Sequence, residues 1–211
     1  MFRRRQTPEP TPDPWTQLLE ALGLGALPSS EVDALRESLP MDLTLVGEAA
    51  ASLREVGAPR LVACFVQPTA QERGPAANPR PAFVLQGDEA HVSAPAFRVF
   101  AHSHPLVTSL QASRTGGSEW PVGDGAFDAR LAVVARDPAI ATWLADARAT
   151  PLRRILLDLL VDSGAPDAVL IVGSGQVTWH AQRPTEVAGT ELEAVAEQLF
   201  GVWAGLRAAG S

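Results

Sequence analysis

The sequence has no lysine and no tyrosine, one cysteine, one asparagine, and no long apolar run. A single cysteine excludes an internal disulfide and dithiol redox chemistry, and it fits a reducing cytoplasm. Because a membrane-spanning helix needs about 18 or more consecutive apolar residues, we expect no membrane span. The Arg3–Arg5 cluster is followed by polar, proline-rich residues rather than by an apolar segment, so we expect no secretion signal and a cytoplasmic protein.

Charge and composition narrow the function classes further. The chain has 17 arginines and 24 acidic residues, which gives a formal net charge of −7 and a pI near 5.1. Binding to nucleic acid or to an anionic membrane needs clustered cations, so we expect neither. The bias toward Ala, Arg, Gly and Pro is typical of a GC-rich bacterial coding sequence. With 46% hydrophobic and 19% charged residues, the chain is globular.

The length of 211 residues predicts one domain. Prolines at every second position from Pro8 to Pro14 favour extended structure, so residues 1–14 are predicted to be a disordered tail. We therefore expect a single domain over residues 15–211. A loop over residues 69–81 is too long for a tight hairpin.

The most readable stretch runs from Gly123 to Leu160. After a turn at residues 123–125, apolar residues alternate from Phe127 to Ala135, which predicts a half-buried strand. Asp137-Pro138 is a helix-start signal, and Thr150-Pro151 repeats it. Leucines and Ile155 then recur at helical spacing as far as Leu160.

This order of motifs resembles a family of uncharacterised bacterial domains with a GDxxFDxxFxV…D…LL core. The matching residues are Gly123, Asp124, Phe127, Asp128, Leu131, Val133, Asp137 and Leu144. This chain has Leu131 where the family usually has Phe, and it lacks the membrane spans beside which many members lie. The resemblance covers Trp15 to the C-terminus, and it implies a fold but no catalytic residues.

The remaining pattern predicts an α+β fold, in which a largely antiparallel sheet carries helices packed on one face. Residues 48–56 favour a short helix, although the preceding strand could run on. The last helix opens with Thr190 and Glu193 spaced as a capping box and has an apolar stripe reaching Leu206. The other predicted helices begin at Asp13-Pro14 and at Ser29 or Ser30, and the predicted strands span residues 41–45, 60–67, 81–86, 90–93, 96–102, 106–112, 168–172 and 176–181.

His102-Ser103-His104 is the most metal-like feature of the sequence. Residues two apart on a strand face the same side, so both imidazoles could reach one ion. A zinc site needs a third protein ligand, for which His91, His180, Cys64 or a carboxylate are candidates without a defining spacing. The alternative interpretation, two partly exposed histidines at a turn before Pro105, is favoured.

Other potential catalytic groups have simpler structural interpretations. Asp124, Asp128 and Asp137 could form a carboxylate cluster, but they suit a turn, a strand face and a helix cap. Cys64 lies in an apolar run and is expected to be buried with a raised pKa. The sequence has no GxSxG, GxxxxGK or HExxH motif.

Two functions therefore stay open on the residues, and the resemblance alone implies a third, a regulatory module for a membrane partner. The first is a non-catalytic domain that binds another protein or self-associates, with no cofactor. The second is a metal-dependent or small-molecule-binding enzyme that uses His102 and His104, which predicts one transition metal per chain.

Overall fold

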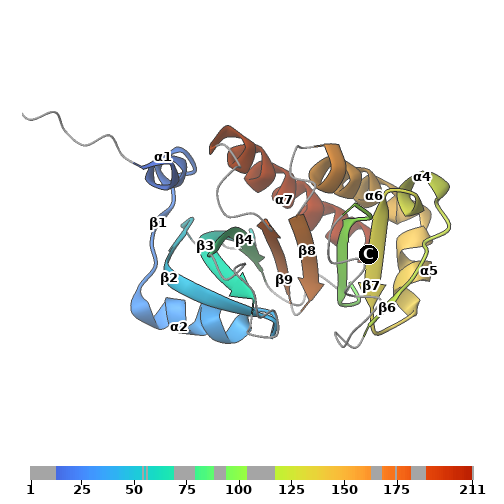
Figure 1. Cartoon of the computed structure of the whole chain (residues 1–211), viewed down its shortest axis with the longest axis horizontal. Helices are drawn as coiled ribbons and strands as arrows, with labels where there is room; N and C mark the ends of the chain where they lie inside the picture. The colour runs from blue at the N-terminus through green and yellow to red at the C-terminus, as the bar shows by residue number, and fades with distance from the viewer. Residues whose placement is uncertain are drawn as a thin grey trace, which may run out of the picture.

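A nine-stranded sheet runs through the protein (Figure 1), as shown by the computed structural model. The structure describes residues 13–53, 55, 57–68, 79–87, 94–103, 117–162, 168–173, 175–181 and 189–210. The strands are β1 (Gly25–Ala26), β2 (Leu43–Ala51), β3 (Arg60–Pro68), β4 (Arg80–Gln86), β5 (Phe97–Ala101), β6 (Ser118–Glu119), β7 (Leu131–Ala135), β8 (Ala168–Gly173) and β9 (Gln176–Ala181).

The order of the strands is β1-β2-β3-β4-β9-β8-β5-β7-β6, and every neighbouring pair is antiparallel. The β8–β9 hairpin, predicted from the Gly-Ser-Gly between its strands, is inserted between β4 and β5. Only two residues of β1 pair with β2, at Ala50 and Ala51, so this margin of the sheet is short.

Helices lie on both faces of the sheet (Figure 1). The α+β class and the antiparallel sheet are confirmed. The face that holds the main core carries most of the helices. However, α2 packs on the opposite face through Leu35, together with Leu39 just after its end, which is an exception to the predicted one-sided packing. The helices are α1 (Pro14–Ala21), α2 (Ser29–Ser38), α4 (Gly125–Asp128), α5 (Ala139–Ala145), α6 (Thr150–Leu157) and α7 (Gly189–Gly210), with a 3₁₀ turn η2 (Ala147–Ala149) and a π-helical turn η3 (Asp158–Asp162).

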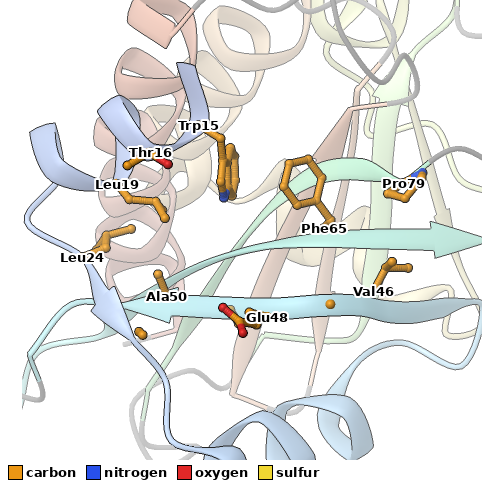
Figure 2. Close-up of a pocket in the computed structure, with 12 residues that line it drawn as sticks. Trp15, Thr16, Leu19, Leu24, Val46, Glu48, Ala50, Phe65 and Pro79 are labelled. Atoms are coloured by element: carbon orange, nitrogen blue, oxygen red, sulfur yellow. The ribbon is translucent and has the colours of Figure 1, made fainter. Parts of the chain in front are cut away.

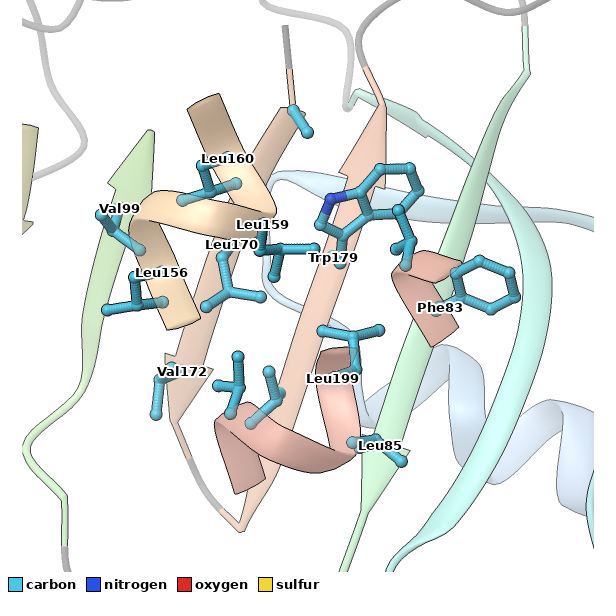
Figure 3. Packing of buried hydrophobic residues seen from close by; sticks show 14 of the residues in the cluster. Phe83, Leu85, Val99, Leu156, Leu159, Leu160, Leu170, Val172, Trp179 and Leu199 are labelled. Atoms are coloured by element: carbon cyan, nitrogen blue, oxygen red, sulfur yellow. The ribbon is translucent and has the colours of Figure 1, made fainter. Parts of the chain in front are cut away.

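The main core lies between the sheet and the helices α6 and α7 (Figure 3). Trp179 on β9 and Phe83 on β4 are fully buried there, with ring centroids 5.9 Å apart. Leu156, Leu159 and Leu160 belong to the same cluster and come from α6 and η3. The helical stripe predicted from Leu152 onward is thus the buried side of this layer, although Ile155 is half-buried.

Three predicted element boundaries are wrong. Phe127 lies in the helical turn α4 rather than on a strand, and β7 begins only at Leu131. The alanines that favoured a helix after residue 48 belong to β2, because pairing with β3 overrides helix propensity. The predicted loop extends to residue 81, whereas β4 already starts at Arg80.

Two predicted strands, residues 90–93 and 106–112, fall outside the described residues, as does most of the predicted tail. In the part of the chain that the structure describes, no helix is both long and apolar enough to cross a membrane.

Candidate functional site

A pocket of about 670 Å³ opens between α1 and the strands β2 and β3 (Figure 2). Its lining includes residues of α1 and Ala26 of β1, so it lies near the short margin of the sheet. The described residues that line it are Trp15, Thr16, Leu19, Leu24, Ala26, Val46, Gly47, Glu48, Ala49, Ala50, Phe65 and Pro79.

Two aromatic rings form the main wall of the pocket. Trp15 and Phe65 have ring centroids 4.4 Å apart with their planes at 44°, and both side chains are half-buried. Tilted aromatic pairs of this kind are favourable contacts that still leave part of each ring face accessible. Large apolar surface is therefore available inside the pocket.

The helix cap before α1 positions the tryptophan. Asp13 Oδ1 accepts hydrogen bonds from the backbone amides of Trp15 at 3.0 Å and Thr16 at 3.1 Å. Asp13 Oδ2 accepts from the Thr16 hydroxyl at 2.7 Å, and this bond is the main cause of the lowered pKa of Asp13. The cap fixes where the helix starts, and so it fixes where Trp15 enters the pocket.

A β-bulge forms the floor of the pocket. Val46 pairs with Phe65 and Ala49 pairs with Cys64, so Gly47 and Glu48 have no partner on β3. Gly47 has φ +73°, which favours glycine. Side chains alternate between the two faces of a strand, so an insertion of two residues does not change which face the later residues point to. Leu45 before the bulge and Ala49 after it therefore both face α2. Bulges redirect side chains, and here the exposed Glu48 carboxylate stands at the rim.

The described lining of the pocket is mostly apolar. Among its described lining residues, Glu48 is the one titratable side chain. The Thr16 hydroxyl is already used in the cap. Acid–base and nucleophilic catalysis use titratable groups that converge on a substrate, and the residues described around this pocket supply one carboxylate, that of Glu48.

His102 lies on a different part of the molecule, just after β5. Its Nε2 is 2.9 Å from the backbone oxygen of Asp128 and 3.9 Å from Glu119 Oε1. His104, the other half of the predicted pair, lies outside the described residues. Within the described ranges, no three His, Cys, Asp or Glu side chains come together as a metal site.

The other candidate metal ligands are spread over the sheet. His180 is buried on β9 and is separated from β5 by β8, and Cys64 is further away on β3. Burial raises the pKa of the Cys64 thiol to about 12. A buried thiol that stays protonated is a poor nucleophile near neutral pH. His91 falls outside the described residues.

The three aspartates of the family-like core each bond to backbone amides. Asp124 Oδ1 accepts from the Phe127 amide at 3.3 Å, and the two oxygens of Asp128 accept from Val122 at 2.8 Å and Gly123 at 2.7 Å. Asp137 Oδ1 accepts from the Ala139 amide at 2.9 Å, as a helix cap does. These bonds give the motif GDGAFD a structural role.

Sequence reasoning missed the pocket, although its parts left signals. The patterns place Trp15 in the helix predicted to begin at Asp13-Pro14 and Phe65 in the strand predicted over residues 60–67. A glycine followed by a charged residue inside an alternating run is a bulge signal, and Gly47-Glu48 has that form. That these residues meet at one pocket depends on how α1 docks on the sheet.

No protein-family model and no curated protein sequence matches this chain.

Proposed function

We propose that this chain is a non-catalytic, protein-binding domain that holds an extended apolar segment of a partner in the pocket between Trp15 and Phe65. The observation that carries the proposal is the half-buried aromatic pair lining a cavity of about 670 Å³ with one titratable group at its rim. Aromatic anchors in pockets of this kind dominate protein interfaces.

Charge favours a particular partner. The Glu48 carboxylate lines a pocket whose other side chains are apolar except for Thr16, and the whole chain carries a net charge of −7. A segment with a large apolar side chain next to a basic residue satisfies both features. The same charge disfavours nucleic acid as the partner.

Selection of peptides by display on the full-length protein tests this proposal. We expect selected peptides to carry an apolar or proline-rich anchor and to lose about tenfold or more in affinity on Phe65→Ala, because a hot-spot contact is removed. Phe200→Ala is the matched control, since Phe200 is a 41% exposed aromatic on α7 that does not line the pocket. Peptides that bind Phe65→Ala as well as wild type would contradict the proposal.

The second function predicted from the sequence, a metal-dependent enzyme using His102 and His104, remains an alternative. Of the two histidines, the structure describes His102, and its Nε2 already contacts the Asp128 backbone oxygen. Elemental analysis of purified protein decides it: a stoichiometric transition metal that is lost on His102→Ala would favour the enzyme. A cytoplasmic location and membership of the uncharacterised bacterial family are parts of the same proposal, supported by the lone Cys64 and by the GDGAFD motif.

A further inference from the structure

The chain that precedes α1 joins the domain two residues before Trp15, which lines the pocket. Residues 1–12, here called the N-terminal arm, lie outside the described residues and join the domain at Asp13. Asp13 caps α1 and bonds to the amide of Trp15, which is itself a wall of the pocket. The arm therefore joins the domain two residues before Trp15, whose ring points toward Phe65 in the pocket (Figure 2).

The arm has the composition that an aromatic-lined pocket binds. Pro8, Pro10 and Pro12 alternate with polar residues. Proline-rich segments dock on aromatic grooves because their extended conformation is preformed and loses little entropy on binding. At about 3.1 Å per residue, the five residues from Pro8 to Pro12 span about 15 Å, enough to cross the cavity.

Charge complements this fit. The arm contains three arginines and one glutamate, whereas residues 13–211 contain 14 arginines and 23 acidic residues. The arm is thus formally +2 and the rest of the chain −9, and the exposed Glu48 stands at the rim of the pocket. Attraction between opposite charges favours the bound arm.

We propose that the N-terminal arm of the same chain occupies the Trp15–Phe65 pocket, with its prolines against the two rings. This inference rests on the proposed function, because it names one occupant of the same site. A short tether gives an effective concentration on the order of millimolar, so even a weak contact is populated within one chain. The arm then competes with a partner segment for the pocket.

Paramagnetic relaxation tests the contact in the full-length chain. A nitroxide is attached through Glu9→Cys, which is selective because the Cys64 thiol is buried with a pKa of about 12. We expect the methyl signals of Val46 and Ala50 in the pocket to lose intensity, while Val133 on β7, near the opposite margin of the sheet, is the control. Undiminished Val46 and Ala50 signals would overturn the proposal.

Two further samples test whether the contact depends on the prolines and whether it forms within one chain. Replacing Pro8, Pro10 and Pro12 with glycine should restore the Val46 and Ala50 signals, and persistent loss would mean a non-specific contact and overturn the proposal. In a mixture of spin-labelled unenriched chains with unlabelled isotope-enriched chains, the pocket signals should stay sharp. Broadening there would place the arm in a second copy of the chain and overturn binding within one chain.

Display-selected peptides separate this inference from the proposed function. If the arm occupies the pocket, the triple glycine variant should bind a selected peptide about threefold or more tightly than wild type, because the competent state is more populated. Peptides that depend on Phe65 but bind both proteins equally would reject the arm and keep the binding function. Absence of any Phe65-dependent peptide would reject the binding function itself.

Discussion

Arg153 on α6 donates through Nε to Asp124 Oδ2 at 3.0 Å and joins two segments 29 residues apart. The same guanidinium donates to the backbone oxygens of Leu144 and Asp146 and to the Thr150 hydroxyl. Its side chain is 12% exposed. One arginine therefore connects the start of α4 with the end of α5 and the start of α6.

Replacing Arg153 should destabilise the domain. Arg153→Ala leaves the Leu144 and Asp146 carbonyls without this donor, and we expect a loss of about 2 kcal/mol in the free energy of unfolding. Arg153→Lys should recover only part of this lost stability, because an ammonium cannot match the planar fork of the guanidinium. Urea unfolding followed by circular dichroism measures both. Arg148→Ala, which breaks an exposed pair with Asp146, is the control and should leave the midpoint unchanged.

Acid should weaken the Asp124 contacts. The pKa of Asp124 is lowered, first by the hydrogen bond from the Phe127 amide and then by Arg153. A carboxyl with a lowered folded pKa stabilises the protein above its unfolded pKa, and this contribution is lost as the pH falls through the folded pKa. The difference in unfolding free energy between wild type and Asp124→Asn should have its largest value above about pH 4 and should shrink as the pH falls below it. A difference that stays constant across urea titrations at successive pH values would contradict this.

The contact between Gly87 and Trp203 should be intolerant of a side chain. A Cβ on Gly87 would lie 2.2 Å from Trp203 Cζ2, and Trp203 is 4% exposed in the core. We expect Gly87→Ala to cost about 1–3 kcal/mol through overpacking. Gly125→Ala is the matched control, because a Cβ there meets nothing within 4 Å. Equal thermal midpoints for the two variants would show that Trp203 can move aside.

A charged substitution at Trp203 tests the packing of α7 on the sheet. Trp203→Asp places a carboxylate in the main core between α7 and the sheet, where it has to be desolvated. We expect it to abolish the cooperative thermal unfolding transition seen by circular dichroism. A melt like that of wild type would mean that α7 contributes little to the core.

Cys64 should react only when the protein unfolds. With a thiol pKa of about 12, the thiolate fraction near pH 8 is on the order of 10⁻⁴, and the residue is 1% exposed. Mass spectrometry should show no alkylation by iodoacetamide in the native state and complete alkylation in urea. Rapid modification of the native protein would indicate local opening between β2 and β3.

Sequence patterns determined the elements whose residues carry their own signals. The alternation in β5, the turn residues between β8 and β9, and the apolar stripe of α7 specify strand or helix without reference to the rest of the chain. The antiparallel α+β class follows from their order. The burial of Cys64 also followed from the sequence, since apolar residues flank it on both sides.

Tertiary structure decided what depends on distant partners. The alanines after Glu48 have helix propensity, but hydrogen bonding to β3 makes them a strand, and the bulge at Gly47 appears only in that pairing. Phe127 fits the alternating apolar pattern of a strand, yet it lies in the helical turn α4, which is capped by Asp124. The pocket between Trp15 and Phe65 joins segments 50 residues apart, so the docking of α1 created a site that local patterns do not encode.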